Sequence, residues 1–96
     1  MSKWKKTLEK CRRGDKNIRW DDVMVLLRRF GIYDTNPKKT GSHRVYSHPL
    51  IDKHDQGNFL VIRRPHGKRE NYIHFKDARK IADYIEMIQY YEEMED

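Results

Sequence analysis

Apolar residues at helical spacing predict a short helix near the N-terminus. Trp4, Leu8 and Cys11 lie at i, i+4 and i+7, so they share one face of a helix that covers residues 3–13. The Gly-Asp pair that follows is expected to end this helix, because both residue types are common in turns. The pattern therefore predicts one short amphipathic helix before residue 14.

The strongest helical pattern follows Trp20. Its apolar residues recur at i, i+3, i+4 and i+7, namely Val23, Leu26, Leu27 and Phe30. We expect Asp21 or Asp22 to cap the N-terminus, where a carboxylate accepts backbone N–H bonds and complements the helix dipole. Gly31 suits the left-handed position that ends many helices.

Extended segments are predicted after this helix. The chain is expected to extend from Ile32 and to turn within residues 36–41, which contain Asn, Pro and Gly. Residues 43–48 predict a strand that a proline ends, and the run Phe-Leu-Val-Ile-Arg at 59–63 predicts the clearest strand. Residues 50–58, which contain two Asp and one Gly, predict a mobile loop.

A second long helix is predicted to begin near Lys76, after a brief extended stretch at residues 72–75. Its apolar stripe has the helical period and consists of Ile81, Tyr84, Ile85 and Ile88. Residues 92–96 are mostly acidic at a helix C-terminus, where the dipole disfavours negative charge, so we expect this end to fray.

The element order predicts an α+β fold in which helices pack on one face of a three-stranded antiparallel sheet, with an extra N-terminal helix. We divide the chain into an N-terminal helical extension at 1–18, a main domain at 19–90 and an acidic tail at 91–96.

Composition narrows the class of protein. Ninety-six residues suit one small domain and exclude an enzyme with a separate cofactor domain. Leu, Ile, Val and Phe number only 20, so the 11 aromatic residues must supply much of the core. The single cysteine excludes a disulfide framework and a cysteine-based zinc site. With no apolar run of membrane-spanning or signal-peptide length, we expect a cytoplasmic protein that does not enter a membrane.

Charge is unevenly distributed along the chain. Residues 1–69 contain 18 Lys and Arg against 7 Asp and Glu, a net charge of +11, whereas residues 70–96 contain 3 against 8, a net charge of −5. A basic body favours a polyanionic partner such as nucleic acid, although a solvated basic surface explains the same excess.

One segment carries candidate chemistry. His43 follows a Gly-Ser turn, and an exposed imidazole there can transfer protons near neutral pH. Lys38, Lys39 and Arg44 place cations where a phosphodiester would approach. His43 and His48 are expected on opposite faces of a strand, which is poor geometry for a shared metal, so we expect neither a metal nor another cofactor.

Two motifs resemble the HicA family of mRNA interferases, the toxins of toxin–antitoxin systems. They are GSHRVYSHP at residues 41–49 and VIRRPHGK at residues 61–68. The element order resembles that family over roughly residues 19–90, with residues 1–18 as an additional segment. The resemblance implies a fold like the double-stranded RNA-binding domain and a HicB-like antitoxin as protein partner.

The resemblance also implies metal-independent cleavage of RNA. His43 matches the family's catalytic histidine, and Gly41 and Ser42 match the turn that presents it. His43 would either remove the 2′-hydroxyl proton or protonate the leaving oxygen, and a second group or water would do the other. His66 and Lys68 are candidates for that second group. Further expected contacts to RNA are Arg63, Arg64, His66 and Lys68.

The sequence leaves two other functions open. The same scaffold could be a non-catalytic RNA-binding module that uses its basic body and exposed aromatic residues. It could also be a protein-interaction domain whose acidic last helix docks on a basic partner. Dependence of RNA cleavage on His43 would separate catalysis from both.

Overall fold

The computed structural model describes residues 2–38, 41–65 and 71–95. Its elements in chain order are α1 (Lys3–Arg13), α2 (Trp20–Arg29), β1 (Tyr33–Asp34), β2 (His43–Ser47), α3 (Pro49–His54), β3 (Leu60–Arg63) and α4 (Phe75–Glu95). The predicted α+β class is confirmed, because three of the helices accompany a three-stranded antiparallel sheet as expected. A fourth helix, α3, was not predicted.

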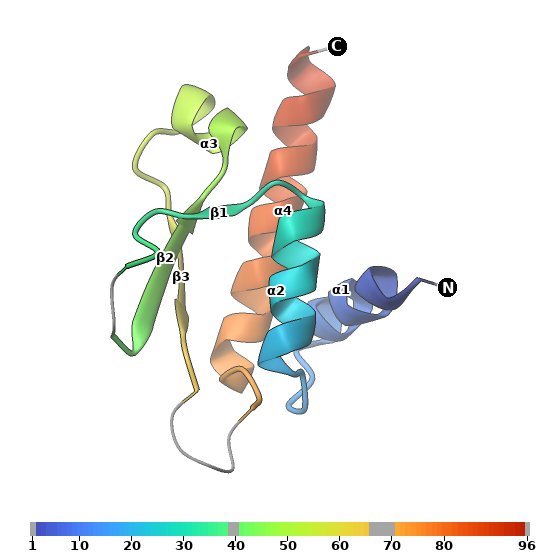
Figure 1. Ribbon diagram of the computed structural model, residues 1–96. Coiled ribbons are helices and arrows are strands. Elements are labelled where there is room, and N and C mark those ends of the chain that lie inside the picture. Colours follow the sequence, from blue (N-terminus) through green and yellow to red (C-terminus); the bar gives the residue numbers. More distant parts are fainter. Residues whose placement is uncertain (1, 39–40, 66–70, 96) are drawn as a thin grey trace.

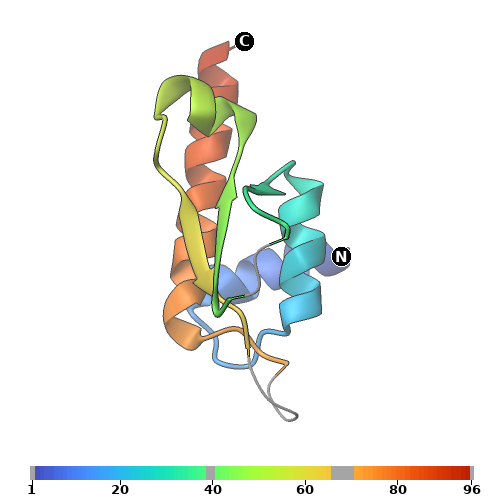
Figure 2. The ribbon, with the colours of Figure 1, turned by 60° about the vertical axis from the view of Figure 1, so that its left-hand side comes forward.

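The sheet has the strand order β1-β2-β3 (Figure 1). β2 is the central strand: His43 pairs with Arg63 of β3, and Ser47 pairs with Tyr33 of the two-residue β1. Helices α2 and α4 lie on one face of this sheet, and α1 packs across both helices (Figures 1 and 2). Among the described residues, no helix lies on the other face of the sheet.

One continuous core connects all of these layers. Leu8 and Cys11 of α1 are buried in the same apolar cluster as Ile62 of β3 and Ile85 of α4. Burial of the Cys11 thiol, with a smaller effect from Asp15, raises its pKa to about 12. The N-terminal extension is therefore integrated into the fold, and its cysteine is an apolar core residue rather than a nucleophile.

The predicted position of α2 is confirmed, but its predicted N-cap is wrong. α2 begins at Trp20, with Arg19 in the capping position, so neither Asp21 nor Asp22 is the N-cap. Both aspartates lie in the first turn, where their charge still complements the helix dipole. Gly31 has a φ of 72°, the left-handed conformation expected for the residue that ends this helix.

Residues 49–54 form helix α3, so the prediction of a mobile loop throughout residues 50–58 was wrong. His48 is the N-cap, its Nδ1 accepting the N–H of Leu50 at 3.1 Å, and Pro49 occupies the first helical turn. Proline is favoured there because its φ suits a helix and its missing N–H is not needed. With Ile51 as its only buried residue, α3 is too short to show an apolar period.

The acidic C-terminus is helical to Glu95, so the expectation that it frays was also wrong. Glu95 forms ion pairs with Lys53 at 2.6 Å and with His54 at 3.0 Å, and the ring of Tyr91 stacks on His54 at 4.7 Å. These contacts join the end of α4 to α3 (Figure 1) and offset the unfavourable helix dipole.

Within the described ranges, none of the helices is both long enough and apolar enough to cross a membrane.

Asp52 of α3 generates a prediction about acid stability. Its carboxylate accepts hydrogen bonds from Ser47 at 2.5 Å and from the Tyr33 hydroxyl, and these bonds hold its pKa below the usual 3.8. Because the folded pKa is lowered, this stabilisation is complete above the unfolded pKa and is lost as the pH falls through the folded one. We expect Asp52→Asn to lower the melting temperature at pH 7. Below pH 4, the melting temperature of the variant should fall less steeply with pH than that of wild type. A decline as steep as that of wild type would show that other carboxylates control acid unfolding.

The contact between α3 and α4 generates a second prediction. Tyr91 packs against the core and stacks on His54, whereas its neighbour Tyr90 is 61% exposed. We expect Tyr91→Ala to reduce the free energy of unfolding by about 1–3 kcal/mol, and Tyr90→Ala to change it by less than about 0.5 kcal/mol. Urea denaturation measures both. Equal effects of the two variants would mean that the end of α4 does not stabilise the fold.

Candidate functional site

A depression of about 500 Å³ lies where β2 begins and β3 ends. These strand ends are at the bottom of the sheet in Figure 1. Four segments meet around it: the α1–α2 connection, the start of β2, the end of β3 and the stretch that leads into α4. The described residues that line it are Lys16, Asn17, Ser42, His43, Arg63, Arg64, Pro65, Tyr72, Ile73, His74 and Phe75.

His43 is exposed at the first position of β2. Its Nδ1 lies 3.2 Å from the hydroxyl of Ser42, so the two side chains share a hydrogen bond whose direction depends on the imidazole tautomer. The backbone carbonyl of Ser42 accepts the N–H of Arg64 at 2.6 Å. The turn is thereby tied to β3, and it presents the ring of His43 at the edge of the depression.

Three cationic side chains among the described residues line the depression. Arg63 and Arg64 contribute from the end of β3, and Lys16 contributes from the α1–α2 connection. None of the described lining residues is acidic. An anionic group in this space therefore contacts positive or neutral side chains among the described lining residues, which favours phosphate.

The wall opposite His43 is a short extended segment held by the N-terminal part of the chain. The N–H of Ile73 donates to Ile18 at 2.8 Å, and the N–H of Trp20 donates to Asn71 at 2.7 Å. Ile18 and Ile73 are buried, and side chains alternate along an extended segment. Tyr72 therefore points away from the core and into the depression.

His74 is a second histidine in the depression. Its Nδ1 accepts the backbone N–H of Lys76 at 3.2 Å, at the first turn of α4, and its ring stacks on Phe75 at 4.9 Å. Because a backbone N–H can only donate, the neutral ring of His74 carries its proton on Nε2. His74 can therefore donate a hydrogen bond to a bound group.

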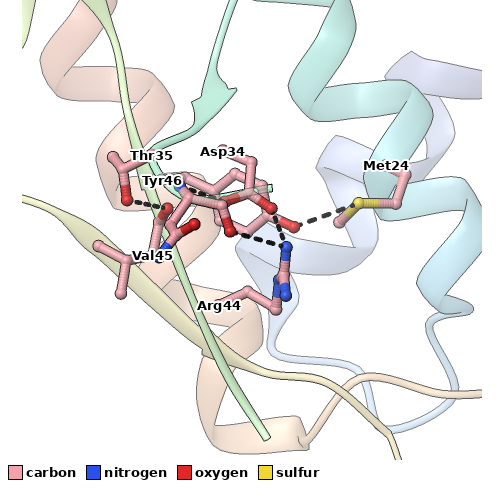
Figure 3. Close-up of polar contacts among 7 residues, drawn as sticks. Met24, Asp34, Thr35, Arg44, Val45 and Tyr46 are labelled. Carbon is pink, nitrogen blue, oxygen red and sulfur yellow. Dashed lines mark hydrogen bonds and ion pairs between the residues drawn. The ribbon is translucent and has the colours of Figure 1, made fainter. Parts of the chain in front are cut away.

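Arg44 does not occupy the position expected for a phosphate ligand. Its side chain points to the helix-covered face of the sheet, is only 7% exposed and forms an ion pair with Asp34 of β1 (Figure 3). Tyr46, two residues further along β2, lies on the same face, and its hydroxyl contacts Met24 of α2 at 3.4 Å. Arg44 thus connects β1 with β2 inside the fold, and we withdraw it from the RNA contacts.

The other predicted site residues divide into three groups. Gly41 and Ser42 form the bend before β2 as expected. Lys38 is exposed in the turn after β1 and does not line the depression. Lys39, His66 and Lys68, also named from the sequence, lie outside the described residues.

The sequence interpretation missed the part of the depression that comes from Lys16, Asn17 and residues 72–75. Two signals were present. Tyr72 and His74 flank an apolar Ile73 in an alternating pattern, and Phe75 stands beside charged residues where a core position is not expected. Nothing in the sequence indicates that Lys16, more than fifty residues earlier, lies at the same place.

A metal centre is not evident in residues 2–38, 41–65 and 71–95, where no group of three or more His, Cys, Asp or Glu side chains could hold an ion. Comparison of the chain with protein-family models, with curated proteins and with solved structures finds no match. The interpretation of the depression therefore depends on its own geometry and on the two motifs in the sequence.

Proposed function

We propose that this chain is a HicA-like toxin, a metal-independent endoribonuclease that cleaves mRNA with His43 as its catalytic histidine. The observation that carries the proposal is the position of His43. It lies exposed at the edge of a depression lined by Arg63, Arg64 and Lys16, with no acidic residue among the described lining side chains.

The mechanism uses the 2′-hydroxyl of the RNA as the nucleophile. With the Nδ1 proton of His43 donated to Ser42, the ring's Nε2 has an open lone pair and can remove the 2′-hydroxyl proton. The 2′-oxygen then bonds to phosphorus as the P–O5′ bond breaks, and the 5′-oxygen takes up a proton. The products are a 2′,3′-cyclic phosphate and a 5′-hydroxyl end.

The surrounding side chains stabilise the transition state. Arg63 and Arg64 lie where they can bind the non-bridging phosphate oxygens, whose negative charge increases during the reaction. His74 can donate its Nε2 proton to one of these oxygens as a hydrogen bond. The donor that protonates the 5′-oxygen is water or one of the sequence candidates, His66 and Lys68.

The fold proposed for this function is the one that the resemblance implies. The succession α2-β1-β2-β3-α4, with both helices on one face of the sheet, supports a relation to the double-stranded RNA-binding domain. In this assignment α1 and α3 are helices added to the fold of the double-stranded RNA-binding domain.

The proposed protein partner is a HicB-like antitoxin that covers His43. The sheet face on which the described residues place no helix supports this choice, because Val61 of β3 is exposed there and Phe59, just before β3, is exposed as well. Exposed apolar residues beside a charged site are typical of a protein-binding surface.

RNA binding without cleavage is the second candidate, because the cations and aromatic rings of the depression would bind RNA whether or not His43 reacts. Mutation of His43 separates the two functions.

We expect His43→Ala to reduce cleavage of single-stranded RNA by at least about 100-fold, the usual effect of losing a general acid or base. The measurement is gel analysis of an end-labelled RNA in the presence of EDTA, with identification of the cyclic phosphate. The free energy of unfolding should change by less than about 1 kcal/mol, since the ring is exposed.

His54→Ala is the matched control, because His54 lies on α3 and does not line the depression. It should cut RNA at the wild-type rate. Cleavage by purified His43→Ala protein at the wild-type rate would refute the catalytic role. Wild-type protein that binds RNA without cutting it would favour the binding module.

The cations of the depression generate a prediction about salt. RNA affinity should fall linearly with the logarithm of salt concentration, and the Arg63→Gln/Arg64→Gln double variant should reduce the slope by about one to two. Arg12→Gln on α1, which does not line the depression, should leave the slope unchanged. Equal slopes for wild type and the double variant would show that RNA phosphates bind elsewhere.

A further inference from the structure

We propose that Tyr72 forms a stacking platform for one unpaired nucleobase of the RNA, next to the phosphate bound by Arg63 and Arg64. This inference builds on the proposed function, since it names the part of the RNA that the depression recognises. It concerns binding, and its test does not require cleavage.

The exposure of Tyr72 is the first observation that supports a ligand. Its side chain is 45% exposed although it lies between the buried Ile73 and the anchored Asn71. No ring partner is found for Tyr72 among the described residues. A large aromatic face is thus directed to solvent inside a depression, where a flat apolar group can cover it.

The backbone around Tyr72 is held in place before any ligand arrives. Tyr72 forms an antiparallel bridge with Arg19, and the hydrogen bonds of Ile73 to Ile18 and of Trp20 to Asn71 flank this bridge. Ordering of the segment is therefore not an additional cost of binding. A preorganised ring of this kind is a better platform than one on a loose loop.

The groups beside Tyr72 indicate a nucleotide rather than an apolar peptide. His74 presents its Nε2 proton, and Lys16, whose ammonium lies 5.9 Å from the ring of Phe75, adds a positive charge on the same side. Arg63 and Arg64 supply two more cations. An aromatic surface, a neutral hydrogen-bond donor and several cations match a base, its edge and its phosphates.

Stacking on Tyr72 requires a base that is not paired inside a duplex. In double-stranded RNA both faces of each base are covered by its neighbours, and recognition is mostly of shape and backbone. A single strand can turn one base out onto an aromatic ring. The platform therefore predicts preference for single-stranded RNA or for a loop.

The test is a binding measurement with the full chain in a His43→Ala background, so that the RNA stays intact. Fluorescence anisotropy of a labelled single-stranded RNA should show a loss of about 5- to 100-fold in affinity for Tyr72→Ala. Tyr72→Phe, which retains the ring, should bind within about 2-fold of the background protein. Tyr90→Ala on α4 is the matched control for an exposed tyrosine outside the depression and should have no effect.

A scan with abasic nucleotides shows whether stacking causes the loss. At one position of the RNA, removal of the base should weaken binding. With that abasic RNA, Tyr72→Ala should lower the affinity by less than a further factor of about 2. Affinity for the matching duplex should not depend on Tyr72. Thermal unfolding of each variant confirms that it is folded.

The outcomes distinguish the Tyr72 platform from the proposed cleavage by His43. Equal affinities of Tyr72→Ala and the background protein for the single strand would overturn the platform, even if wild-type protein cleaves RNA. If Tyr72→Ala lowered the affinity by the same factor for every abasic RNA, the platform would also be overturned. If Tyr72→Ala weakens binding as expected but wild-type protein does not cut RNA, the platform stands and the catalytic proposal fails.

Discussion

The carboxylate of Asp77, fully buried at the start of α4, holds together the end of the molecule that contains the depression. One oxygen accepts the backbone N–H of Arg63 at 2.9 Å, and the other lies 3.4 Å from the ammonium of Lys80. A buried carboxylate without partners is strongly unfavourable, so its bond to the N–H of Arg63 fixes the start of α4 against the end of β3, whereas the Lys80 contact lies within α4. Arg63 pairs with His43, and the segment containing His74 leads into the helix, so both walls of the depression depend on this carboxylate.

The first eighteen residues are equally necessary for this arrangement. Helix α1 is buried against α2 and α4 through Leu8 and Cys11, and the connection after it pairs with residues 71–73. That connection carries Lys16 to the edge of the depression. The N-terminal segment therefore supports the wall that contains Tyr72, because a short extended stretch needs hydrogen-bond partners for its backbone.

The opposite end of the molecule has a different role. There the carboxylates of Asp52 and Glu95 attach α3 to the sheet and to the end of α4 (Figure 1). None of these contacts involves a residue that lines the depression. The contacts of Asp52 and Glu95 can therefore be varied without changing a residue that lines the depression.

The sequence by itself determined the class of fold and the boundaries of most elements, and it singled out His43 as the candidate catalytic residue. Apolar periods of 3.6 and 2 residues reflect local geometry, so they can be read without knowing what each element packs against. Only the tertiary structure decided that Arg44 is paired with Asp34 inside the fold while Tyr72 is exposed beside His43. The charge of an arginine and the aromatic ring of a tyrosine are the same whether the side chain is buried or exposed. Whether each side chain is buried depends on contacts between segments that are far apart in the chain, and no local sequence pattern records these contacts.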